Sequence, residues 1–226
     1  MDKKPIVGII GVGRLGSAIA ARMPKQITLF LADILEDRAA ELAGRIDAQA
    51  KSVIEIFGAA DIIILTTKPS EICHLVKEYS LSMKSGAFLL NMSTSVPTAE
   101  VLKCSDRKDI RIIGAKPICQ AYAISRGHEM LIVSTSDEPT VMETLTWLFC
   151  NLGDVMSGDE MLVKKINDEA TRLGLKLAIN LEGSLKEMGA TNEMINIAKK
   201  TVAVGTILDY PAAEENEYIK ERLKEI

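Results

Sequence analysis

Short runs of aliphatic and β-branched residues alternate with longer amphipathic stretches through the first two thirds of the chain. The apolar runs predict strands at residues Pro5–Ile10, Ile27–Leu31, Asp61–Thr66, Gly86–Asn91, Ile110–Ala115 and Met130–Ser134. The stretches between them predict helices at Leu15–Met23, Glu36–Arg45, Val53–Phe57, Ser70–Glu78, Thr98–Cys104 and Pro139–Leu152. Several strand runs, such as DIIILTT, are almost continuously apolar, as strands covered on both faces of a parallel sheet must be. The alternation therefore predicts an α/β fold with a doubly wound parallel sheet.

The pattern changes after Gly153, where the strand signals stop. Between about Asp159 and Met188, apolar residues recur at the spacing of one helical face, which predicts a single long amphipathic helix. These apolar positions are Val163, Ile166, Ala170, Leu173, Leu177, Leu181, Leu185 and Met188. Gly189 is suited to cap this helix, and a second helix is expected at about Asn192–Asp209.

Two domains follow from these patterns, an α/β domain at residues 1–157 and a small all-helical domain at residues 158–226. The apolar stripe of the long helix needs a partner surface, because an exposed stripe of this length exceeds the apolar patch that a monomer tolerates. We therefore expect a homodimer formed through the C-terminal helices.

Composition excludes several classes of protein. The net charge is −4, with 47% hydrophobic and 26% charged residues, so the chain is globular and a poor electrostatic match for nucleic acid or an anionic membrane. Four scattered cysteines without a C-x-x-C pair, and no clustered metal ligands, argue against a metal site and favour a reducing, cytoplasmic setting. No apolar run reaches the roughly 18 residues of a membrane helix.

A glycine-rich turn joins the first predicted strand to the first predicted helix. Gly11-Val12-Gly13-Arg14-Leu15-Gly16 has the pattern G-x-G-x-x-G between strand and helix. Glycines let such a turn close and let its backbone approach a pyrophosphate at the start of the helix. The motif predicts a Rossmann domain that binds NAD or NADP through these six residues.

The nucleotide preference depends on the residues that follow the second strand. Asp33 stands where an acid hydrogen-bonds the adenosine ribose and repels a 2′-phosphate, which favours NAD. Alternatively, Asp33 caps the next helix. Arg14 and Arg38 are the residues that would serve a 2′-phosphate, so the prediction stays at NAD or NADP.

Three segments taken in order, GIIGVGRLGSAI, DIIILTTKP and NMSTSVPTAEVL, resemble those of the pyrroline-5-carboxylate reductases and of the β-hydroxyacid dehydrogenases, in the superfamily of 6-phosphogluconate dehydrogenase. Both families have a Rossmann domain followed by a helical domain. Thr66-Thr67-Lys68-Pro69 stands where the reductases have a strand ending in V-K-P, so the resemblance implies that these four residues border the cofactor. Ser93 and Thr94 follow the next strand, at the sheet edge where nicotinamide or substrate binds.

The chain departs from the reductases at other positions. Their M-P-N reads Lys116-Pro117-Ile118 here, their G-S-G-P-A-Y falls near Thr171–Leu177 and reads TRLGLKL, and the C-terminal part is shorter. Lys116 is expected either to form a local ion pair or to bind a substrate carboxylate.

The resemblance to β-hydroxyacid dehydrogenases rests on different residues. Lys164-Lys165-Ile166-Asn167-Asp168 is similar to that family's K-x-x-N-N helix, which implies Lys164 as general acid/base and Asn167 as a substrate ligand. Thr171 lies on the same border of the predicted helix, and these three residues are the catalytic candidates. Glu182 is expected to pair with Lys186 at i,i+4.

The sequence therefore predicts an NAD(P)-dependent oxidoreductase that resembles pyrroline-5-carboxylate reductase and transfers hydride between nicotinamide and a small imine. Alcohol oxidation with Lys164, another oxidoreductase chemistry of the superfamily such as a deazaflavin-dependent NADP reductase, and a non-catalytic dinucleotide sensor remain alternatives.

Overall fold

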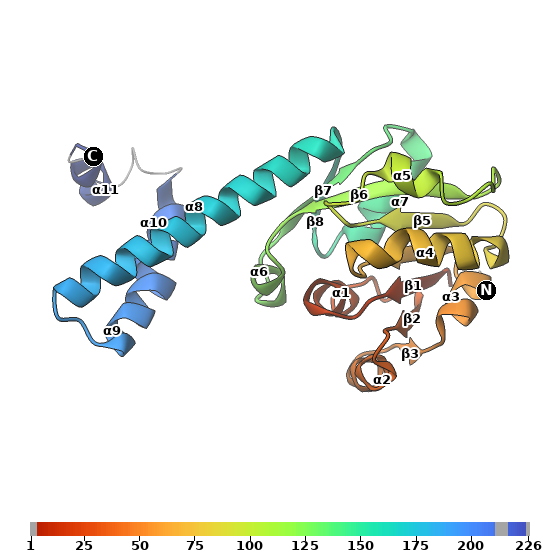
Figure 1. Ribbon diagram of the computed structural model, residues 1–226, viewed down its shortest axis with the longest axis horizontal. Coiled ribbons are helices and arrows are strands. Elements are labelled where there is room, and N and C mark those ends of the chain that lie inside the picture. The colour runs from red at the N-terminus through yellow and green to blue at the C-terminus, as the bar shows by residue number, and fades with distance from the viewer. Residues whose placement is uncertain (1–3, 211–216, 225–226) are drawn as a thin grey trace. The chain divides into compact units, whose positions relative to one another are not determined.

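The computed structural model describes residues 4–210 and 217–224 (Figure 1). The chain forms two compact units, Met1–Asn167 and Asp168–Ile226. This division falls inside a helix, whereas the hydrophobic pattern placed the boundary after residue 157. No helix in the described part of the chain is both long and apolar enough to cross a membrane.

The first unit is built on one sheet in the order β3-β2-β1-β4-β5-β6-β7-β8. Its strands are β1 Ile6–Ile10, β2 Thr28–Ala32, β3 Gln49–Ala50, β4 Ile62–Leu65, β5 Phe88–Asn91, β6 Arg111–Ile118, β7 Met130–Ser134 and β8 Gly153–Ser157. The predicted strands all form, and β3 and β8 are additions to the prediction. The strand order is that of a doubly wound sheet, which begins in the middle and extends to both edges.

One strand pair departs from the predicted parallel arrangement. β6 and β7 are antiparallel, with Ala115 opposite Ser134, while the other neighbours are parallel. Only residues 119–129 connect these two strands, and they hold the short helix α6 (Ala121–Ser125). A parallel crossover needs about a dozen residues or more, so the chain turns back instead.

Helices cover both faces of the sheet. One apolar core packs under α1 (Arg14–Ala20), α2 (Glu36–Arg45), α6 and α7 (Pro139–Phe149), and the other packs under α3 (Val53–Ala59), α4 (Pro69–Tyr79) and α5 (Thr98–Leu102). A short 3₁₀ turn, η1 (Ser80–Ser82), follows α4. Successive strand residues alternate between the cores, as Ile64 and Leu65 of β4 do. Burial on both faces explains the continuous apolar strand runs.

The second unit contains most of α8 (Glu160–Glu187), then α9 (Asn192–Ile197), the π-helical segment η2 (Ala198–Ala203), α10 (Val204–Asp209) and α11 (Glu217–Leu223). Gly189, at φ +82, ends α8 as predicted, because its N–H donates to Lys186 O and that of Ala190 donates to Leu185 O. The predicted ion pair also forms, with Glu182 Oε1 at 2.7 Å from Lys186 Nζ.

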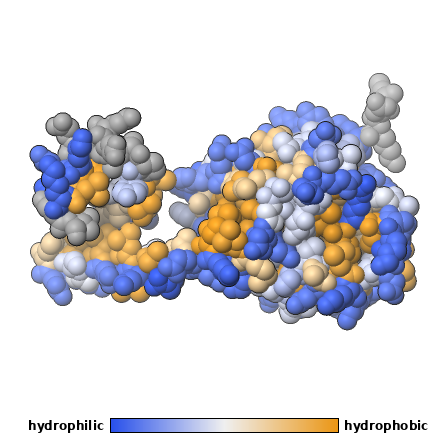
Figure 2. All heavy atoms as spheres, turned by 90° about the horizontal axis from the view of Figure 1, so that it is seen from above, coloured by the Kyte–Doolittle hydropathy of each residue, from blue (hydrophilic) through white to orange (hydrophobic). Residues whose placement is uncertain are grey.

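Apolar side chains of the second unit remain largely exposed. Among its described residues, Ile195 is the one that is buried. Hydrophobic residues gather over its helices in Figure 2, and the exposed ones include Leu173, Leu177, Ile197, Ile207 and Leu208. Such a unit lacks an interior of its own to stabilise it.

Candidate functional site

The glycine-rich turn after β1 requires glycine at two of its positions for steric reasons. Gly11 has φ +96, and a Cβ there would lie 2.8 Å from the backbone of Thr66 and Thr67. A Cβ on Gly16 would lie 2.0 Å from Gly11 O. Thr66 Oγ1 donates to the same oxygen at 2.6 Å, which ties the turn to the end of β4. The turn is therefore a tight, fixed connection between β1 and α1.

Gly13 plays a different part in the same turn. A Cβ built on it meets no atom within 4 Å, so the space beside this residue is open. Gly13 is the N-cap of α1, and the first N–H groups of a helix have no partner within the helix. This open, donor-rich position fits a pyrophosphate of NAD or NADP, which Gly13, Arg14 and Leu15 would hold through their backbone.

The Asp33 carboxylate braces the turn from the end of β2. Its Oδ2 accepts from Val12 N at 2.8 Å and its Oδ1 accepts from Leu35 N at 3.0 Å. The side chain is only 6% exposed, and Arg38 Nη1 lies 3.7 Å from Oδ1. Asp33 is thus engaged with the backbone, and a neighbouring cation offsets its charge.

A cavity of about 680 Å³ adjoins the turn on the side of α1 and α2. Its lining carries four arginines, namely Arg14, Arg22, Arg38 and Arg45, together with the acid Glu41. Guanidinium groups bind phosphate oxygens in a bidentate manner, so the basic side of this cavity suits an additional phosphate group.

A smaller pocket of about 280 Å³ lies where β4, β5 and β6 end. It is lined by Leu15, Thr66, Thr67, Pro69, Met92, Ser93, Thr94, Ser95, Pro117, Cys119, Ala121 and Asn167. The carboxyl edge of a doubly wound sheet is where ligands bind. We refer to this space as the edge pocket.

Thr67 supplies the clearest sign of a ligand in the edge pocket. Its Oγ1 is buried and has no hydrogen-bond partner among the described residues. Buried hydroxyls are normally paired, because an unpaired one loses its water without compensation. This hydroxyl therefore fits a polar group of a cofactor or substrate. The thiol of Cys119, by contrast, lines the pocket as an uncharged group, because burial raises its pKa to about 11.

The polar wall of the edge pocket comes from the segment between β5 and α5. We call Ser93–Pro97 the hydroxyl loop, because Ser93, Thr94 and Ser95 all line the pocket. Asn91, fully buried at the end of β5, holds this loop through two hydrogen bonds. Its Nδ2 donates to Val96 O at 2.8 Å, and its Oδ1 accepts from Ser93 N at 3.1 Å.

Lys116 forms an ion pair, which is one of the two roles that the sequence predicted for it. Its side chain is 1% exposed and its Nζ lies 3.3 Å from Glu160 Oε2. Binding of a substrate carboxylate, the other prediction, does not fit a cation buried in this way. Sequence reasoning missed Glu160, although a lysine inside the apolar run IIGAKPI does signal that a buried acceptor exists.

The structure brings together part of the predicted site. Thr66, Thr67, Pro69, Leu15, Ser93 and Asn167 share the edge pocket, where Asn167 Nδ2 donates to Pro117 O at 2.9 Å. Lys68 is exposed at the start of α4 and Lys164 is half-buried on α8, and neither is part of the pocket lining. Thr171 is exposed and belongs to the second unit.

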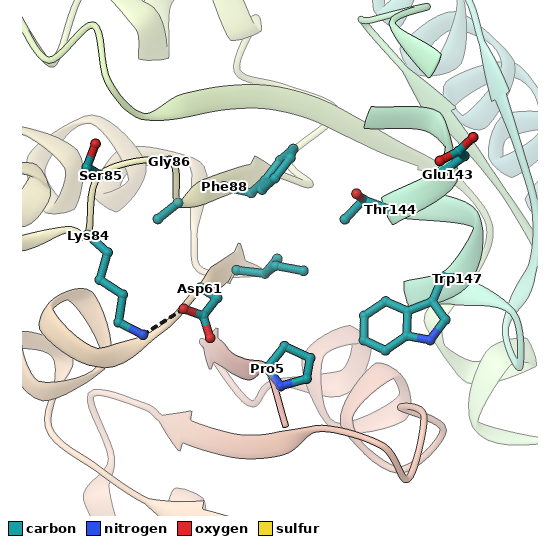
Figure 3. Close-up of a pocket in the computed structure, with 11 residues that line it drawn as sticks. Pro5, Asp61, Lys84, Ser85, Gly86, Phe88, Glu143, Thr144 and Trp147 are labelled. Atoms are coloured by element: carbon teal, nitrogen blue, oxygen red, sulfur yellow. Dashed lines mark hydrogen bonds and ion pairs between the residues drawn. The ribbon is translucent and has the colours of Figure 1, made fainter. Parts of the chain in front are cut away.

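A further cavity, of about 510 Å³, lies at the opposite edge of the sheet, where β1, β4 and β5 begin (Figure 3). Pro5, Phe88 and Trp147 line it, and Lys84 Nζ pairs there with Asp61 Oδ1 at 2.6 Å. It shares no residue with the glycine-rich turn or the edge pocket, and ligands of doubly wound sheets bind at the other edge.

Comparisons with known proteins agree with this geometry. Residues 6–93 match the family described as NADP oxidoreductase coenzyme F420-dependent. No curated protein sequence matches the chain. Among solved structures, a pyrroline-5-carboxylate reductase from Coxiella burnetii is similar with a TM-score of 0.73 and 16% identity, over 99% of this chain and 86% of that one.

Two other solved structures are similar over most of their length. Pyrroline carboxylate reductase from Plasmodium falciparum with NADP bound has a TM-score of 0.70 and 16% identity, over 92% of this chain and 79% of that one. An imine reductase from Pseudomonas sp. has a TM-score of 0.67 and 18% identity, over 94% and 77%. The predicted resemblance is confirmed: residues 6–93 match the NADP oxidoreductase family, and the chain shares its fold with solved pyrroline-5-carboxylate and imine reductases.

Proposed function

We propose that this protein is an NADP-dependent oxidoreductase that reduces the C=N bond of a small imine in the edge pocket. The observation that carries the proposal is the unpartnered buried hydroxyl of Thr67, a residue that lines the edge pocket together with the hydroxyl loop. When bound, the cofactor supplies the hydride that adds to the imine carbon, while a proton from water adds to nitrogen, giving the amine and NADP⁺.

The chain's own residues place and enclose the reactants. Thr67 Oγ1 donates to a polar group of the nicotinamide or the substrate, and the Ser93 and Thr94 hydroxyls hold polar groups of the substrate. Pro117, Cys119 and Ala121 form the apolar wall that limits water in the pocket. A volume of about 280 Å³ suits a small substrate rather than a large one.

The arginine-lined cavity supports NADP as the preferred nucleotide. Asp33, which would otherwise favour NAD, is occupied by Val12 N and Leu35 N and lies beside Arg38. Arg14 and Arg38 would then hold the 2′-phosphate. The family match to an NADP domain supports the same preference.

The first experiment is titration with NADPH and NADH, followed by NADPH oxidation with cyclic imines that carry a carboxylate. We expect tighter binding of NADPH and turnover with an imine. Thr67→Val should lower kcat/KM about tenfold, because one hydrogen bond is lost at the reacting end. Thr146→Val, at an exposed threonine on α7, is the matched control and should leave kcat/KM unchanged.

Other outcomes decide between the alternatives. Tight NADPH binding with no turnover on imines, keto acids or hydroxyacids would indicate a sensor. Oxidation of a hydroxyacid that disappears in Lys164→Ala would indicate the β-hydroxyacid dehydrogenase chemistry instead. Absence of NADPH and NADH binding at millimolar concentration would contradict both the enzyme and the sensor.

A further inference from the structure

The hydroxyl loop is attached to the protein interior through a lysine that no part of the proposed reaction uses. Lys116 Nζ donates to Ser93 O at 2.5 Å and to Val96 O at 2.9 Å, and it pairs with Glu160 Oε2 at 3.3 Å. We propose that Lys116 and Glu160 are positioning residues that hold the hydroxyl loop in the shape that receives the substrate. This inference rests on the proposed function of the edge pocket.

The contacts of Lys116 exclude a direct catalytic part for it. An ammonium group has three N–H donors, and Ser93 O, Val96 O and Glu160 Oε2 account for three acceptors. The side chain is also 1% exposed. Lys116 therefore neither donates a proton into the pocket nor binds a substrate carboxylate, and it acts on the loop alone.

Glu160 extends the attachment to the other end of the loop. Its Oε1 accepts from Thr98 N at 2.8 Å, and its Oε2 accepts from Thr98 Oγ1 at 2.7 Å. Thr98 is the first residue of α5, directly after Pro97. The loop is thus fixed at Ser93 and Val96 by β6 and at its exit by the first turn of α8.

The positive charge of Lys116 contributes to holding the hydroxyl loop. Burial lowers the pKa of Lys116 from 10.5 to about 8, and Glu160 opposes this shift. Glu160 is the one charged group among the described residues that contributes to this pKa. The ammonium is therefore charged at neutral pH. Above about pH 8 it becomes an amine with two donors for the three acceptors, so the ion pair with Glu160 is lost and the attachment of the loop is weaker.

The test compares Lys116→Met with the double variant Lys116→Met/Glu160→Gln. The single variant leaves the Glu160 carboxylate, 14% exposed, without its cation and is expected to be less stable. The double variant removes both charges and should recover thermal stability. If the pair positions the loop, both variants still show faster hydrogen exchange at the amides of residues 93–96, by about tenfold or more.

Kinetics provide the second readout. In the double variant we expect KM for the imine to rise about tenfold while the Kd of NADPH stays within about twofold, because Lys116 holds the substrate side of the pocket. In the wild type KM should rise above about pH 8, and this rise should be absent in the double variant. A double variant with wild-type loop exchange and wild-type KM would show that the pair only balances charge, and the proposal would fail.

Lys84→Met is the matched control. It also breaks a lysine–carboxylate pair, with Asp61, but at the opposite edge of the sheet (Figure 3). Its loop exchange should equal that of the wild type.

The exchange measurement needs neither cofactor nor substrate, so the two proposals can fail separately. If the variants exchange faster in the loop but the wild type reduces no imine, the loop attachment stands and the oxidoreductase proposal is contradicted. If exchange in the variants is unchanged and imine reduction is normal, the positioning role alone is contradicted.

Discussion

Gly13 and Gly16 of the glycine-rich turn show how two identical residues in one motif can serve packing and binding separately. The Cβ of an alanine at position 16 would collide with Gly11 O at 2.0 Å and with Thr66 Oγ1 at 2.7 Å, so the need for glycine is internal to the fold. At position 13 nothing lies within 4 Å and φ is −69, which suits any residue. Glycine at position 13 is thus required by the cofactor pyrophosphate that would approach it, and not by the conformation of the turn.

This difference predicts opposite phenotypes for two small substitutions. Gly16→Ala should destabilise the protein by about 1–3 kcal/mol, because the clash involves backbone that cannot move freely. Gly13→Ala should leave the stability within about 0.5 kcal/mol but weaken NADPH binding about tenfold or more, since its methyl group occupies the space of the pyrophosphate. Thermal unfolding and NADPH titration of both variants check this. A Gly13→Ala protein that binds NADPH normally would contradict the assigned cofactor position.

Residue patterns and the family resemblance together indicated much of the edge pocket but not its supporting contacts. Ser93 was foreseen because it follows a buried strand and the ends of parallel strands meet at one edge. Thr67 was foreseen because its segment resembles the one that borders the cofactor in the reductases. The bracing of Val12 N by Asp33 was not, since an acid at this position also suits ribose binding or helix capping. Glu160 was missed because its partner, Lys116, is remote in sequence and only the fold brings them together.

At the scale of elements, continuous apolar runs identified the six central strands, but edge strands lacked such a signal. β3 has two residues, both exposed, and β8 reads GDVMS with most of its side chains exposed. Neither run carries the burial pattern that marks a strand. The strand β7 was predicted, but its antiparallel direction was not. Strand direction depends on the length of the connection and not on the strand's own composition.

A charged cluster joins α8 to η2 in the second unit. Glu182 of α8 contacts Lys186 on its own helix and Lys199 of η2, and hydrogen bonds from these lysines lower the pKa of Glu182 to about 2. Because the folded pKa lies below the ordinary value of 4.5, the stabilisation is complete above about pH 4.5 and is lost as the pH falls through about 2.

Glu182→Gln should therefore lower thermal stability at pH 7, and the difference from the wild type should shrink as the pH falls from about 4.5 toward 2. High salt should reduce the effect, because the cluster is exposed and screened. Unfolding curves across this pH range give the measurement, with Glu187→Gln, exposed on the same helix, as control. A constant difference at every pH would show that Glu182 acts through packing instead.

At the scale of the whole molecule, the two units differ in how they are stabilised. The first has two extensive cores around its sheet, whereas the described residues of the second bury Ile195 alone. Helices with this much exposed apolar surface require a partner. We propose that the partner is a second copy, because closed homodimers are the commonest way in which identical surfaces cover one another.

Size-exclusion chromatography with light scattering should then give about twice the 24.6 kDa of one chain. Leu177→Glu, at an exposed apolar position of the second unit, should shift the protein toward monomer. Leu81→Glu, at an exposed apolar position of the first unit, is the control and should leave the mass unchanged. A clean monomer for the wild type at micromolar concentration would contradict the dimer.

The buried Lys116–Glu160 pair also constrains how relatives of this protein can diverge. A lone charge in the interior is far less stable than either the pair or two neutral residues, so neither position can change first without loss. Lineages should therefore replace both residues together or retain both. We expect covariation between the end of β6 and the first turn of α8, with an acidic residue at position 160 wherever position 116 is lysine. Chimeras that exchange one of these two segments between lineages should misfold more often than chimeras that exchange both.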